Sequence, residues 1–191
     1  MQWSWGANLS LENHPFVQKY LQGATVTVEI ATGVTAVMPL CRDVVGLTLA
    51  ELLQEAGQVP AAIQVVESLE PSAVAAVSLA ELYLEANRPE DVVQLSNGLA
   101  NEDDPTALLL TFRGTALPQI GQPGAARETL KAALAPRSRS AEIRHLARLA
   151  RASTYLAEGK KAMAKKDLER VLAEDANFPG LDQALAQLDA N

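Results

Sequence analysis

Four stretches of the chain repeat one pattern of apolar and polar residues: an amphipathic run, a short polar turn, and a second amphipathic run. Each turn carries one glycine or asparagine, and these turn residues are Gly57, Asn87, Gly121 and Gly159. They follow one another at intervals of 30, 34 and 38 residues. A period of about 34 residues with helical spacing in both runs is typical of stacked helical hairpins. The pattern therefore predicts four hairpins packed side by side.

Prolines and capping residues mark where the predicted helices begin. Pro60, Pro89 and Pro123 each open a second helix, where a missing N–H group costs little. Candidate N-caps of the first helices are Ser72, Asp104 and Ser140. The expected first helices cover residues 43–56, 72–86, 105–120 and 140–158, and the expected second helices cover 60–70, 89–100, 123–135 and 160–174. Pro118 falls near the end of the third first helix, so we expect that helix to be kinked or shortened there.

The residues before the repeats show a different pattern. A short amphipathic helix starts at Pro15, and alternating β-branched residues at 25–30 and 34–40 predict a small β-hairpin. The chain is therefore expected to divide into an N-terminal extension, residues 1–41, and a helical repeat domain, residues 42–191. The repeats are expected at about 43–71, 72–104, 105–138 and 140–175, followed by a capping helix at 179–189.

Small residues stand where the paired helices would touch. They are Ala50, Ala80, Gly114 and Ala152 in the first helices, and the matching positions across the turn are Ala62, Val92, Ala126 and Ala164. With the turn residues and the aromatic Tyr83 and Tyr155, they make residues 43–175 resemble the tetratricopeptide repeat (TPR) family. The resemblance implies an all-α fold: a right-handed α-solenoid of about four helical hairpins, with a C-terminal capping helix and a small N-terminal β-hairpin.

The resemblance also implies a function. Members of the family bind peptides or other proteins in a concave groove lined by first helices, and some grip a C-terminal carboxylate with Lys, Arg and Asn. The matching positions here lack this clamp and are mostly aliphatic: Val44, Leu47, Val74, Val77, Leu108, Leu146 and Leu149, with Glu51 and Glu81. Because large apolar surfaces rarely stay open, we expect this groove to hold a partner helix, the N-terminal hairpin or a second copy of the chain.

The net charge of -7 is unevenly distributed along the chain. Residues 1–126 hold 4 Lys/Arg and 14 Asp/Glu, whereas residues 127–191 hold 12 and 9. A basic face is predicted from Arg137, Arg139, Arg144, Arg148, Arg151, Lys160 and Lys161. It fits a solvated surface with intrahelical pairs such as Glu158 with Lys161, or a site for an acidic protein or the acidic half of a second copy. Nucleic acid is least favoured, because the chain is acidic and no aromatic residues alternate with the bases.

No arrangement of residues indicates catalysis, a metal site or a cofactor. His14 and His145 are far apart and lack evident nucleophile or metal-ligand partners, so we expect His145 on the surface. Cys41 is the single cysteine, which excludes an internal disulfide, and we expect a buried or half-buried structural thiol. The sequence has neither the roughly 18 apolar residues of a membrane helix nor a secretory-type start. We therefore expect a cytoplasmic protein that does not enter a membrane.

Together these features predict a non-catalytic scaffold that binds a protein or peptide partner in the apolar groove. The alternative is a homo-oligomerisation module, in which the acidic front of one copy meets the basic back of another. A two-fold homodimer is the expected form, because head-to-tail contacts that do not close would form filaments. The least favoured hypotheses are an enzyme and a nucleic-acid-binding protein.

Overall fold

The computed structural model describes residues 11–136 and 138–190. It is mostly helical (67%), with one two-stranded antiparallel sheet. Contacts between residues divide the chain into two compact units, residues 1–86 and residues 87–191. The division falls inside the second predicted repeat, so each unit is described by itself. Within the described ranges, none of the helices combines the length and the apolarity that crossing a bilayer requires.

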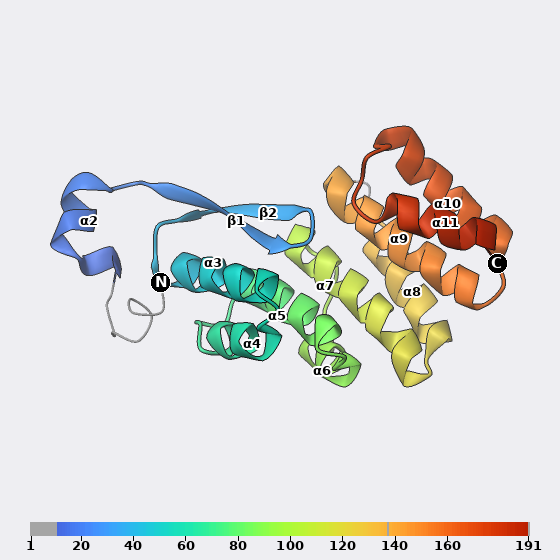
Figure 1. The fold of residues 1–191 in the computed structure, drawn as a ribbon, viewed down its shortest axis with the longest axis horizontal. Coiled ribbons are helices and arrows are strands. Elements are labelled where there is room, and N and C mark those ends of the chain that lie inside the picture. Colours follow the sequence, from blue (N-terminus) through green and yellow to red (C-terminus); the bar gives the residue numbers. More distant parts are fainter. Residues whose placement is uncertain (1–10, 137, 191) are drawn as a thin grey trace. The chain divides into compact units, whose positions relative to one another are not determined.

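The first unit contains a β-hairpin and three repeat helices, preceded by two short helical segments (Figure 1). Its elements are η1 Leu11–Asn13, α2 Pro15–Tyr20, β1 Thr25–Ala31, β2 Val34–Pro39, α3 Arg42–Glu55, α4 Val59–Glu67 and α5 Ala73–Glu85. Helix α4 packs against both α3 and α5. Their apolar faces form the core, in which Leu47, Ala62 and Leu82 are at most 2% exposed.

The predicted β-hairpin is confirmed, and it packs on helices of its own unit. β1 pairs with β2 in antiparallel register, with Thr25 opposite Pro39. Side chains alternate over most of β1, so Val28 and Ile30 are buried while Thr27 and Glu29 are exposed. β1 contacts both α3 and α5. An isolated hairpin is marginally stable in water, so this packing is what stabilises it.

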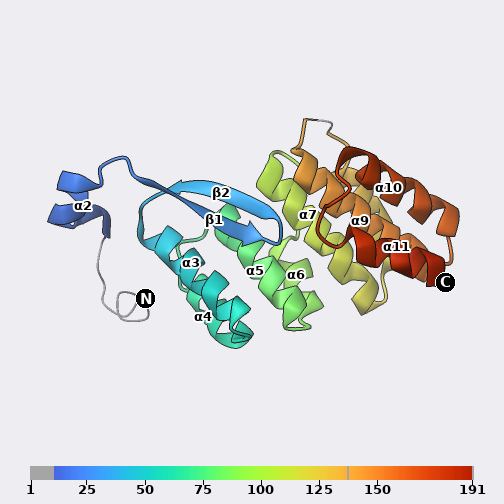
Figure 2. The ribbon, with the colours of Figure 1, turned by 45° about the horizontal axis from the view of Figure 1, so that its top comes forward.

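The second unit contains the other repeat helices and the C-terminal helix (Figure 2). Its elements are α6 Pro89–Leu95, α7 Asp104–Ala116, η2 Leu117–Ile120, α8 Pro123–Ala133, α9 Ala141–Ala157, α10 Lys161–Glu174 and α11 Leu181–Ala190. Helix α9 packs against α7, α8 and α10. The predicted capping helix is α11, which contacts α9 and α10. There Phe178 and Leu181 join Leu168 and Val171 in one apolar cluster.

The small residues of the repeat pattern lie at helix contacts, as predicted. Ala50 in the first unit and Ala152 in the second are at most 1% exposed. At Gly114 on α7, an added Cβ atom would come within 2.4 Å of the Leu130 Cγ atom on α8. Because no real Cβ atom lies that close to a neighbour, this helix contact requires glycine.

The four predicted turn residues end their helices in the same way. Their φ angles are 70° at Gly57, 56° at Asn87, 77° at Gly121 and 72° at Gly159. This left-handed region favours glycine and tolerates asparagine. Three turns also share one hydrogen bond of 2.8–2.9 Å, in which the N–H group of Gln58, Gln122 or Lys160 donates to the carbonyl of Leu53, Leu117 or Tyr155. These endings support helical hairpins of the tetratricopeptide type.

The boundaries of α7 differ in two ways from the prediction. The α-helix ends at Ala116 and continues as the 3-10 turn η2, because Pro118 has no N–H group to donate. The shortening predicted at Pro118 is therefore confirmed. The N-cap is Asp103 rather than the predicted Asp104, since the Asp103 carboxylate accepts the Thr106 N–H at 2.9 Å in a reciprocal capping box.

Two other helix starts and one helix end can be compared with the predicted boundaries. Ser72 caps α5 as predicted, with its Oγ accepting a backbone N–H at 3.1 Å. Ser140 occupies the N-cap position of α9 but makes no side-chain cap. The helix predicted at 89–100 ends earlier, at Leu95, and Gly98 beyond it has a left-handed backbone with φ of 72°.

Candidate functional site

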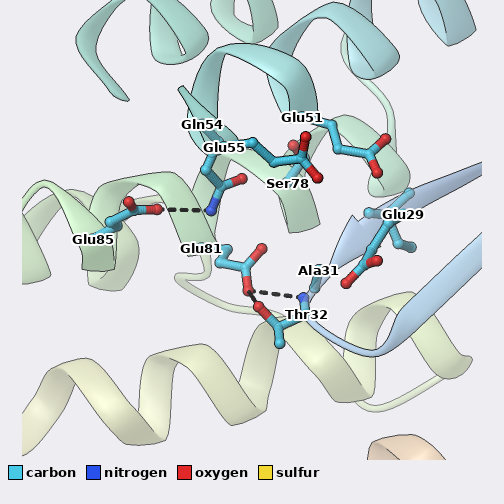
Figure 3. A pocket seen from close by; sticks show the side chains of 10 residues that line it. Glu29, Ala31, Thr32, Glu51, Gln54, Glu55, Ser78, Glu81 and Glu85 are labelled. Carbon is cyan, nitrogen blue, oxygen red and sulfur yellow. Dashed lines mark hydrogen bonds between the residues drawn. The ribbon is translucent and has the colours of Figure 1, made fainter. Parts of the chain in front are cut away.

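Five glutamates surround a pocket in the first unit, called the acidic pocket below (Figure 3). They are Glu29 on β1, Glu51 and Glu55 on α3, and Glu81 and Glu85 on α5. The cavity has a volume of about 220 Å³, and its described lining contains no lysine or arginine. Across residues 11–136 and 138–190, no group of His, Cys, Asp and Glu side chains is arranged to hold a metal ion.

Three of these glutamates accept hydrogen bonds from neutral donors. Thr32 at the hairpin tip donates both its N–H and its Oγ1–H to Glu81 Oε1, at 2.8 and 2.7 Å. Gln54 Nε2 donates to Glu85 at 2.7 Å, and Glu29 accepts an N–H of the hairpin turn at 2.8 Å. None of the five forms an ion pair with a described lysine or arginine, so no described cation neutralises their negative charge.

Burial and mutual repulsion raise the pKa of two carboxyl groups in the acidic pocket. The pKa of Glu81 lies above its ordinary value chiefly because the group is buried, and repulsion from Glu29 and Glu85 acts in the same direction. Burial also raises the pKa of Glu51, with repulsion from Glu29 and Glu55. A nearby cation would favour the ionised forms and lower both pKa values.

The structure places the residues of the predicted apolar groove mainly in the core, and in the first unit the N-terminal hairpin, one of the three expected occupants, packs on α3 and α5. The buried ones, at most 2% exposed, are Val44, Leu47, Val77 and Leu108. Val74 is half-buried, and Leu146 and Leu149 pack against the cluster that contains Phe178. In the first unit β1 covers α3 and α5, and in the second unit α11 packs on α9. The two glutamates predicted for the groove, Glu51 and Glu81, line the acidic pocket.

A second cavity, called the basic cavity below, lies in the second unit and has a volume of about 600 Å³. Its lining consists of Lys131, Leu134 and Ala135 at the end of α8, Arg144, Arg148 and Arg151 on α9, and Arg170 and Glu174 on α10. The three arginines of α9 are those that the sequence places on one helix face. Five cationic side chains and a single carboxylate are thus among the described lining residues.

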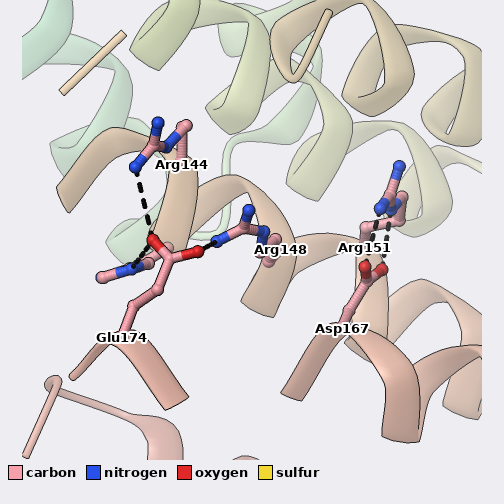
Figure 4. A network of polar contacts seen from close by, with 6 residues as sticks. Arg144, Arg148, Arg151, Asp167 and Glu174 are labelled. Carbon is pink, nitrogen blue, oxygen red and sulfur yellow. Dashed lines mark hydrogen bonds and ion pairs between the residues drawn. The ribbon is translucent and has the colours of Figure 1, made fainter. Parts of the chain in front are cut away.

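The carboxylate of Glu174 on α10 contacts several polar side chains of α9 (Figure 4). Arg148 donates to this carboxylate at 2.9 Å and Arg144 donates at 3.3 Å. The Nε2 atom of His145 lies 3.1 Å from it. The hydrogen bond with His145, followed by the bond and charge of Arg148 and the charge of Arg144, holds the pKa of Glu174 below its ordinary value, although burial opposes this shift.

Asp167 on α10 forms a separate, bidentate pair with Arg151 on α9 (Figure 4). The two hydrogen bonds are both 2.7 Å long. The Asp167 side chain is 4% exposed and the Arg151 side chain is 18% exposed. The hydrogen bonds to Asp167 raise the pKa of Arg151 above its already high ordinary value. This pair therefore stays ionised and fixes α10 against α9.

Of the other residues of the predicted basic face, Arg139, Lys160 and Lys161 are not among the lining residues of the basic cavity. Arg139 donates from Nε to Asn101 Oδ1 at 2.9 Å. Lys161 is exposed at the start of α10. Arg137 lies outside the described residues.

Glu158, which was predicted to pair with Lys161, pairs with two other residues in the structure. Lys160 approaches the Glu158 carboxylate to 2.7 Å, and Arg127 from α8 approaches it to 2.8 Å. The pKa of Glu158 is lowered, first by the hydrogen bond from Lys160. The contact from Arg127 joins two helices, which a search for pairs within one helix does not reveal.

The prediction of a surface histidine at position 145 is wrong. His145 is 3% exposed, and its ring meets the ring of Phe178 edge-on, with 5.0 Å between the centroids. Phe178, in the segment between α10 and α11, covers His145 on α9. The two residues are far apart in sequence, so helical periodicity does not predict this contact. Cys41 is half-buried at the N-cap position of α3, as predicted.

Sequence reasoning found part of each site. It singled out Glu51 and Glu81 but missed the three other glutamates of the acidic pocket. A signal was present, because α3 and α5 each carry two glutamates four residues apart, a spacing at which like charges repel. Lys131 and Arg170 were missed because they reach the basic cavity from helices that neighbour α9 only in three dimensions.

No protein-family model matches this sequence, and a search of curated proteins finds no match. Among solved structures, the chain is similar to the N-terminal domain of the EccA1 ATPase from the ESX-1 secretion system of Mycobacterium tuberculosis, with a TM-score of 0.65 and 16% identity. That domain contains tetratricopeptide repeats. The match covers 80% of this chain and 56% of the other chain. At this identity the likeness shows the fold alone, which is a mostly helical, tetratricopeptide-like fold.

Proposed function

We propose that this chain is a non-catalytic protein-interaction scaffold of the tetratricopeptide type, whose acidic pocket receives a basic segment of a partner protein. The observation that carries the proposal is the convergence of five glutamates from β1, α3 and α5 on one cavity without a neutralising cation among the described lining residues. The fold shared with the N-terminal domain of EccA1 supports a scaffold role.

The size of the acidic pocket favours a protein side chain over a small-molecule ligand. Clefts that bind small molecules usually have volumes of about 300–1,000 Å³, whereas this pocket has about 220 Å³. A lysine or arginine side chain of a partner would place its charged group among the carboxylates. Its aliphatic part would lie along the apolar lining residues Ile30 and Ala31.

Glu51 and Glu55 are the expected contacts for the incoming cation. Their carboxylates accept no hydrogen bond from another described residue, whereas the other three glutamates already hold neutral donors. A bound cation would lower the raised pKa of Glu51. Binding should therefore release protons at weakly acidic pH, and the affinity should rise as the pH increases toward neutrality.

A short synthetic peptide of alternating lysine and alanine, titrated calorimetrically at low ionic strength, tests the proposal. The double variant Glu51→Gln/Glu55→Gln should bind it at least about tenfold more weakly, because two charge-assisted contacts are lost. The matched control, Glu70→Gln/Glu102→Gln, removes the same charge at exposed positions outside the pocket. Its affinity should change little. Equal weakening in both doubles would show general charge attraction and contradict the proposal.

Self-association is a second candidate function, favoured by the charges of the two units. Residues 1–86 hold 2 Lys/Arg and 9 Asp/Glu, whereas residues 87–191 hold 14 of each kind. In such an assembly the acidic pocket of one copy would face the basic cavity of another. Sedimentation velocity at two salt concentrations tests this, since the contact should weaken as salt screens the charges. A monomer at high protein concentration and low salt would contradict self-association.

A further inference from the structure

We infer that the basic cavity bounded by α8, α9 and α10 is a second docking site, which binds an acidic segment of a partner protein. The inference does not depend on the acidic pocket, because the basic cavity lies in the other unit and takes the opposite charge. Each site has its own lining residues, so each can be removed while the other is kept.

The basic cavity carries more positive charge than the carboxylates in and beside it neutralise. Glu174 and Asp167 each balance the charge of one arginine of α9. Among the described residues, the one ion-pair contact of Lys131 is an exposed one of 3.5 Å with Glu128. Arg170 has no ion-pair partner among the described residues. Lys131 and Arg170 therefore offer positive charge to an incoming anion from two sides of the cavity, α8 and α10.

One arginine of α9 is already held in place for a ligand. Arg148 is 14% exposed and bonds Glu174 through its Nη1 atom. A guanidinium group has five N–H donors, so Arg148 keeps donors for a second carboxylate. Because neighbouring groups already order this side chain, little conformational entropy is lost when it binds.

Three features favour an acidic polypeptide over other anions. The volume of about 600 Å³ lies in the range of ligand-binding clefts, well above the space that a single small inorganic ion occupies. Leu134 and Ala135 add an apolar surface beside the cations, which suits an aliphatic residue between acidic ones. The described lining contains no aromatic ring on which a nucleic-acid base would stack, and the chain as a whole carries a charge of -7.

The test uses a fluorescently labelled peptide of repeated Glu-Glu-Leu triplets and the full chain, with binding followed by anisotropy. The double variant Lys131→Gln/Arg170→Gln should bind at least about fivefold more weakly, as expected for the loss of two partly exposed charge contacts. The control Lys161→Gln/Lys166→Gln removes the same charge from exposed positions of α10 outside the cavity. Its affinity should change by less than about twofold. All four positions are exposed, so the fold should tolerate each change.

Four outcomes would overturn the inference. Equal weakening in both double variants would show that no particular site is involved. Displacement of the peptide by inorganic phosphate at comparable concentration would assign the cavity to a small anion. Tighter binding of a single-stranded RNA oligonucleotide, lost in Lys131→Gln/Arg170→Gln, would assign it to nucleic acid. Self-association of the unliganded chain that this double variant abolishes would assign it to a second copy.

Discussion

Both units bring carboxylates of neighbouring elements together, but among the described residues the glutamates of the acidic pocket have no cationic partner, whereas Glu174 and Asp167 of the second unit do. In the acidic pocket three of the five glutamates have hydrogen-bond donors, all without charge, and the pKa values of Glu51 and Glu81 are raised. In the second unit Glu174 has two arginines and its pKa is lowered, while Asp167 is paired with Arg151. Identical chemical groups thus act differently: the paired carboxylates hold helices together, and the unpaired ones are available to a partner.

The same comparison identifies the ligand-binding groups within the second unit. Most of its cations serve structural pairs, so they are weak indicators of a binding site. Among the described cations that line the basic cavity, the exceptions are Lys131 and Arg170, whose charges the neighbouring carboxylates leave largely unbalanced. In each unit, the residues expected to bind a partner are those whose charge the fold does not neutralise.

The largest effect is expected where a structural pair of the second unit is broken. Asp167→Ala leaves Arg151 half-buried without its bidentate partner, and should lower the free energy of unfolding by about 2–4 kcal/mol. Glu169→Ala on the same helix removes only an exposed contact of 3.8 Å with Lys165, and should cost less than about 0.5 kcal/mol. Urea unfolding of both variants checks this. Similar losses would show that the pair with Asp167 has no special structural role.

Helix contacts in the two units offer the next comparison. Gly114→Ala should cost about 1–3 kcal/mol, because its Cβ atom would overlap Leu130. Ala50, at the corresponding position of the first unit, already fits its helix contact, so Ala50→Gly should cost about 1–2 kcal/mol through helix propensity and the loss of a buried methyl group, without any overlap. Gly124→Ala is the control, since the nearest atom to its Cβ is the end of a flexible arginine at 3.9 Å. It should be neutral or stabilising in thermal unfolding. Destabilisation by Gly124→Ala equal to that by Gly114→Ala would contradict the packing argument.

Two substitutions of Glu81 distinguish its role as a hydrogen-bond acceptor from the effect of its charge. Glu81→Ala removes the acceptor of both Thr32 hydrogen bonds at the hairpin tip, and should lower the free energy of unfolding by about 1–2 kcal/mol. Glu81→Gln keeps an oxygen acceptor and removes the repelling charge, so at neutral pH it should be neutral or slightly stabilising. Thermal unfolding of both variants distinguishes the roles. A Gln variant as unstable as the Ala variant would show that the charge itself is needed.

Acidification should affect the two units in opposite directions. The folded pKa of Glu51 lies above the ordinary 4.5, so between these values the folded chain binds more protons and stability rises as the pH falls. The folded pKa of Glu174 lies below 4.5, so its contribution is lost as the pH falls further. Glu51→Gln should therefore exceed the wild type at pH 7, by less than about 1 kcal/mol because the group is largely solvated, and lose this advantage below pH 4.5.

Glu174→Gln should behave in the opposite way to Glu51→Gln. It should be less stable than the wild type at neutral pH and approach it in acid, where Glu174 of the wild type becomes protonated as well. Thermal unfolding over a series of pH values checks both variants. Parallel curves for wild type and both variants would contradict the assigned pKa directions.

Much of the fold was predictable because the signals are local. A turn residue such as Gly121 must adopt a left-handed backbone, and a small residue such as Gly114 must stand where two helices of one hairpin touch. Both requirements act within one repeat, so the residues that meet them recur periodically in the sequence. The N-cap of α7 was misplaced by one residue, because Asp103 and Asp104 are both suitable caps and only the backbone geometry selects the first.

The sites were less predictable because they depend on contacts between distant segments. The groove positions look exposed until β1 is placed on α3 and α5, and His145 looks exposed until Phe178 is placed on it. The same holds for Glu29, which reaches the acidic pocket from the hairpin. Helical periodicity shows which residues share a face, but not which neighbouring element covers that face.

The most direct test of two oppositely charged sites is a crossed titration. The wild type, Glu51→Gln/Glu55→Gln and Lys131→Gln/Arg170→Gln are each titrated with the lysine–alanine peptide and with the Glu-Glu-Leu peptide at one ionic strength. The first double variant should lose affinity only for the basic peptide, and the second only for the acidic peptide. If either double variant weakens both peptides equally, or neither variant changes the binding of its own peptide, the division of binding between the two units is contradicted.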